Sequence, residues 1–152
     1  MARMRMRIKT LLLLTCLLGS CKTAYNPWQV QRLEGVQEDY SAAKISYNDR
    51  NEAMQLKMEL LFAKDSIRAY ILLPHLSAPA SSELPITLQI GLQEPLQTLA
   101  HLRHGQQKAV LDTNTTRHII EALNSQQTVK ISAAGFSQTF TPEYFCQSFN
   151  QG

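Results

Sequence analysis

Hydrophobic and polar residues alternate with a period of two along much of the chain after residue 50. The alternation is clearest in residues 53–62, where Met, Leu and Phe side chains take every second position. A period of two places one set of side chains on a buried face and the other toward solvent, as in a half-buried strand. Met and Leu are good helix formers, but the strict alternation predicts a strand here.

The same alternation predicts six or seven short strands. A polar turn at residues 64–66 separates the first two, which we expect to form a β-hairpin. Residues 74–85 are rich in Pro and Ser and predict a loop. The strands are expected at residues 53–62, 67–73, 86–92, 96–103, 108–111, 128–133 and 136–140.

Two segments follow a helical pattern instead. Residues 114–125 place Ile119, Ile120 and Leu123 on one side, which predicts an amphipathic helix. Asp112 precedes it, and we interpret this residue as the helix cap rather than a catalytic acid. A short C-terminal helix is expected after Pro142, with Phe145 and Phe149 one turn apart.

These elements predict the fold class α+β. The connections are too brief for crossover helices, so the sheet is expected to be mainly antiparallel, as a sandwich or an open barrel. Residues 27–36 fit a helix and a strand about equally, and residues 41–51 read as a loop. We therefore expect a tether and irregular N-terminal segment over 21–50 and a strand-rich globular domain over 51–152.

The first twenty residues have the layout of a secretory signal peptide. Basic residues alternate with apolar ones up to Lys9, an apolar run follows, and the small residues Gly19 and Ser20 end the segment. The apolar stretch of about 11 residues is shorter than the roughly 20 that a membrane-spanning helix needs. The segment 1–20 is therefore expected to direct export rather than to span a membrane.

The end of this segment is more specific. Leu18-Gly19-Ser20-Cys21 resembles the lipobox of bacterial lipoproteins. The resemblance implies cleavage between Ser20 and Cys21 and attachment of acyl chains to Cys21, so that the protein is anchored in a membrane. Lys22 follows where an Asp would resemble an inner-membrane retention signal, which favours the outer membrane, facing the periplasm.

The net charge of +3 does not indicate a nucleic-acid partner. Four of the 15 basic residues lie in the first nine positions, which leaves 11 basic against 12 acidic residues in the rest of the chain. A nearly neutral body offers no basic surface to a phosphate backbone.

The sequence indicates no enzyme, cofactor or metal. His101 and His104 share a predicted strand but face opposite sides of it, and no third ligand for zinc can be assigned. Nucleophile-elbow and phosphate-binding motifs do not occur. Cys146 is the one cysteine left after processing and is predicted to be a small buried side chain; a hydrolase using Cys146 or a His is the weaker alternative.

Aromatic residues gather near the C-terminus, at Phe140, Phe145 and Phe149 among others. We predict that they belong to the core. The alternative is an apolar groove for a partner or a lipid tail.

The order of elements resembles the pilotins of type III secretion systems, small outer-membrane lipoproteins that escort a secretin ring. Residues 109–149 are also similar in outline to the invasion-associated locus B family. The predicted anchor, the nearly neutral body and the lack of a catalytic motif favour a non-enzymatic binding or assembly factor of the envelope, with a pilotin-like role and a protein partner. The alternative function is a lipoprotein carrier or sensor of an apolar ligand.

Overall fold

Nine antiparallel strands form one sheet in the computed structural model, which describes residues 24–33, 42–50, 55–74, 81–103 and 107–152. The strand order is β1-β2-β3-β4-β7-β6-β5-β8-β9, so β1 and β9 are the two edges of an open sheet. The strands are β1 Trp28–Leu33, β2 Ala42–Tyr47, β3 Lys57–Ala63, β4 Ser66–Leu72, β5 Glu83–Ile90, β6 Leu96–Leu102, β7 Lys108–Leu111, β8 Val129–Ala133 and β9 Phe136–Phe140. The helices are α1 Thr113–Asn124 and α2 Phe145–Phe149. The prediction of an α+β fold dominated by an antiparallel sheet is confirmed.

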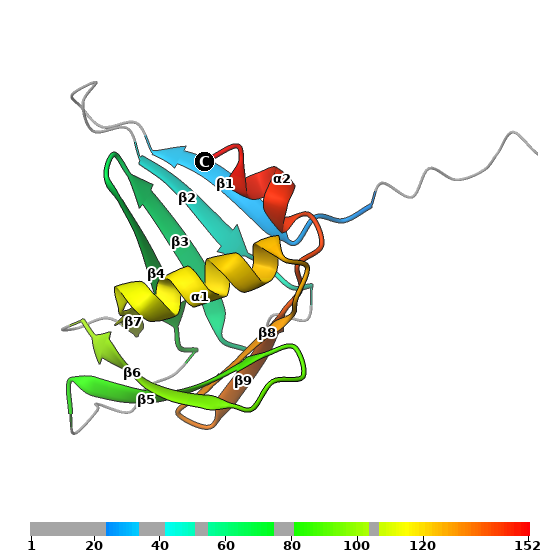
Figure 1. Ribbon diagram of the computed structural model, residues 1–152. Coiled ribbons are helices and arrows are strands. Elements are labelled where there is room, and N and C mark those ends of the chain that lie inside the picture. The colour runs from blue at the N-terminus through cyan, green and yellow to red at the C-terminus, as the bar shows by residue number, and fades with distance from the viewer. Residues whose placement is uncertain (1–23, 34–41, 51–54, 75–80, 104–106) are drawn as a thin grey trace, which may run out of the picture.

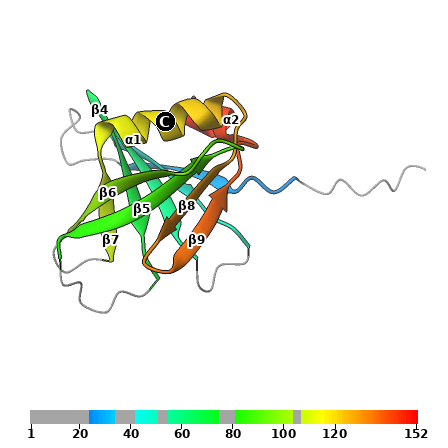
Figure 2. The same cartoon turned by 60° about the horizontal axis from the view of Figure 1, so that its bottom comes forward.

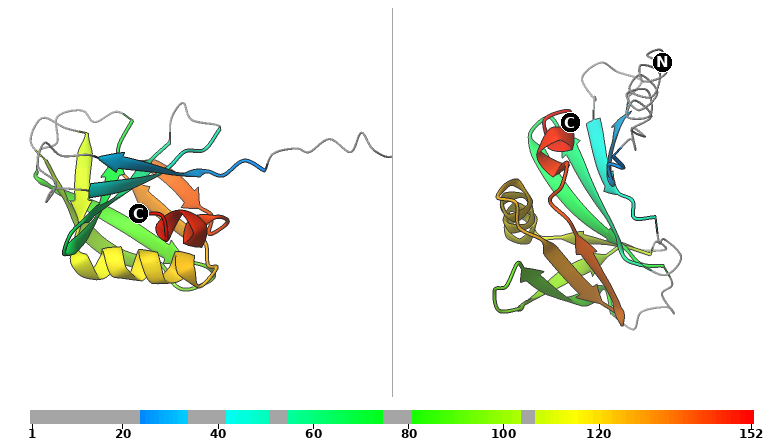
Figure 3. Two further views of the ribbon diagram at one scale, coloured as in Figure 1. Left: turned by 90° about the horizontal axis from the view of Figure 1, so that it is seen from above. Right: turned by 90° about the vertical axis from the view of Figure 1, so that its right-hand side faces the viewer.

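The sheet curves, and both helices lie on one side of it (Figure 1). Strands β1 to β4 are neighbours in the sheet in the same order as in the chain. Strand β7 then pairs with β4 on one side and with β6 on the other, and β5 follows β6. Helix α1 connects β7 to β8 and lies across the open side of the curved sheet, as two further views show (Figures 2 and 3). This placement puts α1 opposite β5 and β6.

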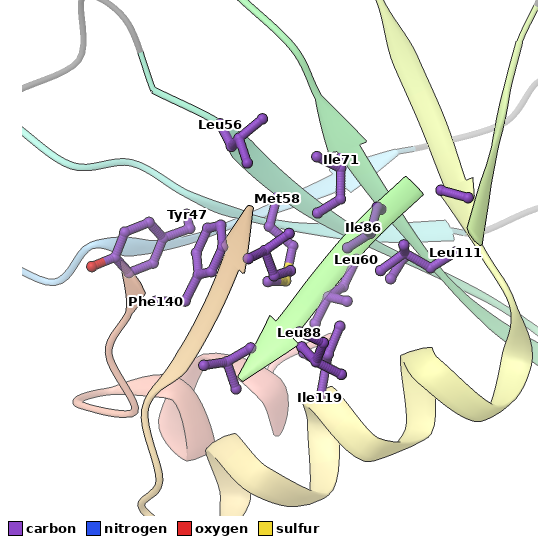
Figure 4. Packing of buried hydrophobic residues seen from close by; sticks show 14 of the residues in the cluster. Tyr47, Leu56, Met58, Leu60, Ile71, Ile86, Leu88, Leu111, Ile119 and Phe140 are labelled. Atoms are coloured by element: carbon purple, nitrogen blue, oxygen red, sulfur yellow. The ribbon is translucent and has the colours of Figure 1, made fainter. Parts of the chain in front are cut away.

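One continuous core fills the space between the curved sheet and the helices. Met58 and Leu60 of β3 and Ile86 and Leu88 of β5 point inward and are at most 2% exposed. Ile119 of α1 packs toward them (Figure 4). The period-two pattern therefore reports correctly which side chains of β3 and β5 face the core.

The prediction of a tether and irregular N-terminal segment over 21–50 is wrong at Trp28–Leu33 and Ala42–Tyr47, which are strands. β1 and β2 pair with each other from Trp28↔Tyr47 to Leu33↔Ala42, and β2 pairs with β3. The predicted loop over 41–51 contains β2, and the segment 27–36 forms a strand up to Leu33. The sheet therefore starts at Trp28, before the expected domain boundary at residue 51.

Trp28 explains why the N-terminal strand joins the sheet. Its ring is 1% exposed and lies with its centroid 4.8 Å from those of both Tyr47 and Phe145. The indole Nε1 donates a hydrogen bond to the carbonyl oxygen of Thr141 over 2.8 Å. Phe140 of the opposite edge strand lies 6.4 Å from the same ring. Trp28 thus connects the two edges of the sheet through side chains, over a long sequence separation that no local pattern reveals.

The strand count of six or seven is corrected to nine because β1 and β2 were not among the expected strands. The expected loop over 74–85 also ends earlier, since β5 begins at Glu83 and includes Pro85. Pro85 is tolerated there because the β5–β8 ladder begins one residue later, at Ile86.

Candidate ligand groove

A groove of about 520 Å³ lies between α1 and the adjoining ends of β5 and β6. We call it the α1 groove. Its size is within the range of small-ligand and peptide-anchor pockets. Its lining residues are Leu88, Ile90, Gln93, Glu94, Leu96, His118, Glu121, Ala122, Ser125 and Gln127.

The floor of the α1 groove is apolar because the strand pattern continues past the core. Leu88 and Ile90 are inward-facing residues of β5, and Leu96 is the first residue of β6. Leu88 is 2% exposed, whereas Leu96 is 50% exposed. The inner face of the sheet is therefore covered by α1 at Leu88 but remains partly open to water at Leu96.

The helical side of the groove is one stripe of α1. Glu121 and Ala122 follow His118 by three and four residues, and Ser125, the C-cap residue, follows them by four and three, so the four share one side of the helix. The core-facing side chains of α1, including Ile119 and Leu123, lie on the adjacent face. The helix thus separates the core from the groove, and its groove side is mostly polar.

The turn between β5 and β6 adds an apolar tip beside the groove. Leu92 is fully exposed there, between the groove residues Ile90 and Gln93. A single exposed Leu is ordinary on a protein surface. Leu92 is not among the residues that line the groove, so the half-exposed Leu96 is the apolar side chain of the lining that is most open to water.

Asp112 fixes the start of α1 and hence this side of the groove. Its Oδ1 accepts a hydrogen bond from the Thr115 amide over 2.8 Å, and its Oδ2 accepts one from Thr115 Oγ1 over 2.7 Å. The amide of Thr115, followed by its hydroxyl, holds the pKa of Asp112 below its ordinary value of 3.8. The predicted capping role of Asp112 is confirmed.

Asp112→Ala should therefore destabilise the protein by about 1 kcal/mol, because a helix N-cap contributes roughly that amount. Since the pKa of Asp112 is lowered by folding, the carboxylate's contribution is present above pH 3.8 and is lost as the pH falls through the folded-state pKa. Asp112→Asn is the matched control, because Asn caps helices without titrating. Urea unfolding at neutral and acid pH measures both variants; equal stability of Asp112→Ala and wild type at neutral pH would contradict the capping role.

The alternative reading of Phe140, Phe145 and Phe149 as a partner groove is wrong for the first two. Phe140 and Phe145 are 0% exposed and belong to the core, as predicted. Phe149 is half-buried, and its ring centroid lies 5.2 Å from that of Phe62. Because Phe140 and Phe145 pack around Trp28 inside the core, these two rings are not free to receive a ligand.

The candidate residues Cys146 and His101, which the structure describes, do not lie together in a reactive cluster. Cys146 is half-buried rather than buried, and its thiol donates to Oδ1 of Asn124 over 3.3 Å. His101 is exposed on β6, while His75 and His104 lie outside the described residues. Within the described part of the chain, no group of three or more His, Cys, Asp or Glu is arranged to hold a metal ion.

A charged cluster lies on the other face of the sheet, away from the groove. Lys108 Nζ donates to Glu59 Oε2 over 2.7 Å, and Lys44 Nζ lies 3.5 Å from Glu59 Oε1. Burial raises the pKa of Glu59, but the hydrogen bond and charge of Lys108, with the charge of Lys44, outweigh it and bring the pKa below 4.5. Lys108 also lies over the ring of Tyr70, 4.4 Å from its centroid. We interpret this cluster as structural, because its charges are paired with one another.

A second hollow, of about 800 Å³, lies at the ends of β1 to β4 and is lined in part by Leu33, Phe62 and Ile67. It adjoins residues 34–41, which lie outside the described residues. We take the α1 groove as the candidate site because a helix face, two strands and the turn between them all contribute to its lining.

Ser20 and Cys21, the predicted cleavage and lipidation residues, also lie outside the described residues. Among the helices that are described, none is long and apolar enough to cross a membrane. Comparison of the chain with protein-family models, curated proteins and solved structures gave no match.

Most groove residues had been assigned only to strands and a helix by sequence reasoning. The predicted amphipathic helix turns Ile119, Ile120 and Leu123 inward, and His118 beside them is exposed at the groove. The signal that was available is the apolar Leu92 and Leu96 on either side of a polar turn. What the sequence does not show is that α1 crosses this end of the sheet.

Proposed function

We propose that this chain is a lipid-anchored protein of the bacterial envelope that binds an apolar segment of another envelope protein in the α1 groove. The role is non-enzymatic and pilotin-like, in that the anchored body holds or escorts its partner. In this proposal the curved sheet acts as an open barrel whose mouth α1 covers in part. The anchor is Cys21, in the outer membrane and facing the periplasm.

One observation carries the binding role: the apolar inner face of the sheet continues past α1 into an open groove. Leu96 pairs with the buried Leu88 across the β5–β6 ladder and is 50% exposed on this face, and Leu92 is fully exposed in the turn that precedes β6. Covering these side chains with an apolar partner removes their surface from water, at about 25 cal/mol for each Å². The signal-like N-terminus and the lipobox resemblance support the envelope location.

The volume of the groove favours a second candidate function, the carriage or sensing of a small apolar ligand. A groove of about 520 Å³ accommodates one acyl chain or a molecule of similar size. Both candidates use the same floor, so they differ in the occupant rather than in the site.

Leu96→Gln should reduce partner capture, because it places a polar group on the groove floor. Leu99→Gln is the matched control, since Leu99 is 46% exposed on the same strand but is not a groove residue. Both replacements affect half-exposed side chains, so neither should unfold the protein. The measurement is affinity purification after mild crosslinking of cells that express each full chain.

We expect one defined protein to copurify with wild type and Leu99→Gln in similar amounts, and at most about a tenth as much with Leu96→Gln, a factor that corresponds to about 1.4 kcal/mol. Copurification of lipid without protein would favour the carrier function instead. Equal capture by the two variants would contradict binding in the α1 groove.

A further inference from the structure

The α1 groove has an acidic rim around its apolar floor. Glu94, in the turn between β5 and β6, and Glu121, on α1, both line it from opposite sides. Among the described residues that line the groove, none is Lys or Arg. The acidic side chains of the lining therefore face no Lys or Arg within it.

A neighbouring cation does not cancel this charge. Arg117 Nε lies 3.9 Å from Glu121 Oε1, one helical turn away on α1, but the two side chains are 62% and 65% exposed. An ion pair that open to water is weak and is screened by salt. Glu94 has no cationic neighbour among the groove residues, so the two carboxylates and Arg117 together leave one net negative charge at the rim.

The shape of the groove sets the length of the segment that fits it. His118 and Ser125 mark the two ends of the α1 stripe, and seven residues at a rise of about 1.5 Å separate them by roughly 10 Å. This length matches about two turns of a helix laid along the groove. A helix of that kind docks through apolar side chains three or four residues apart.

We propose that the occupant of the α1 groove is a cationic amphipathic segment of a protein, with apolar side chains on the floor and Lys or Arg side chains toward Glu94 and Glu121. This assignment rests on the proposed function and specifies the partner's chemistry. The same carboxylates repel the headgroup of a fatty acid or an anionic phospholipid, so charge complementarity favours a basic protein segment over a lipid.

Two synthetic peptides of equal length test this assignment. They share one leucine face, and one carries Lys while the other carries Glu at all remaining positions. Each is labelled with fluorescein and titrated with the full chain held in nanodiscs of phosphatidylcholine, with empty nanodiscs subtracted. Fluorescence anisotropy gives the affinity at low and at moderate salt.

The Lys peptide should bind at least tenfold more tightly than the Glu peptide at low salt, and added salt should narrow the difference. Replacing both rim carboxylates, as Glu94→Gln with Glu121→Gln, should lower the affinity for the Lys peptide by about fivefold, as expected for the loss of two exposed charge pairs. The matched control is Glu83→Gln with Glu143→Gln, which removes two exposed carboxylates that are not groove residues and should leave the affinity unchanged.

Leu96→Gln separates failure of this assignment from failure of the proposed function. In one outcome, Leu96→Gln lowers the affinity for both peptides, but wild type binds the two peptides equally well. In another, Leu96→Gln again lowers both affinities, but Glu94→Gln with Glu121→Gln has no more effect than its control. Either outcome overturns the acidic rim as the recognition element and leaves binding in the groove intact. If neither peptide binds, or Leu96→Gln binds both as wild type does, the cationic segment is overturned together with the groove.

Discussion

Phe145→Ala should leave the protein unfolded or only marginally stable. The side chain is 0% exposed, and its ring centroid lies 4.8 Å from that of Trp28 and 5.5 Å from that of Phe149. Truncating a buried Phe to Ala costs about 3–5 kcal/mol, and a domain of this size has about 5–15 kcal/mol of stability in total. Replacing Phe149 as well should add less, because that ring is half-buried.

Unfolding is conveniently measured through Trp28, the single Trp of the chain, which packs against Phe145. Urea titrations followed by its fluorescence compare Phe145→Ala with Leu99→Ala. The control truncates an apolar residue that is 46% exposed and should lose far less stability. A folded Phe145→Ala variant with an unchanged midpoint would mean that this ring is not part of the core and would restore the groove reading of the C-terminal aromatic residues.

Cys21→Ser should abolish both lipid attachment and removal of residues 1–20. The thiol is the group that the lipobox resemblance assigns to acylation, and a hydroxyl does not replace it as the nucleophile at neutral pH. The measurement is labelling with a clickable palmitate analogue, together with the electrophoretic size of the product. We expect no label and an unprocessed precursor.

Cys146→Ser is the matched control for this experiment, because it removes a cysteine of the folded body and leaves the lipobox intact. It should be labelled and processed as wild type is. Equal labelling of Cys21→Ser and wild type would contradict the lipoprotein assignment.

The strands with local alternation could be predicted from the sequence, and β1 and β2 could not. In β3 and β5 every second side chain is a large apolar one, so the pattern is visible in a short window. β2 turns Ala43, Ile45 and Tyr47 inward, but Ala and Tyr are weak hydrophobic signals. In β1 only Trp28 is fully buried. The aromatic partners of Trp28, Phe140 and Phe145, are more than a hundred positions away in the sequence. Their contacts with Trp28 fix the position of β1 at the edge of the sheet.

The α1 groove could not be predicted from the sequence for a related reason. The stripe of His118, Glu121 and Ser125 has the polar composition of any solvent-exposed helix face. It becomes one side of a binding site only because α1 crosses the sheet beside Leu88 and Ile90. The capping role of Asp112, by contrast, depends on residues three positions apart and was predictable.

Site-specific photo-crosslinking in living cells tests binding in the α1 groove most directly. A photoreactive amino acid is placed at position 96, on the groove floor, or at position 99, which has similar exposure on the same strand. We predict a protein adduct of one defined mass from position 96, reduced about fivefold when Glu94 and Glu121 are both replaced by Gln, and no such adduct from position 99. Equal adducts from the two positions, or none from position 96, would contradict the account.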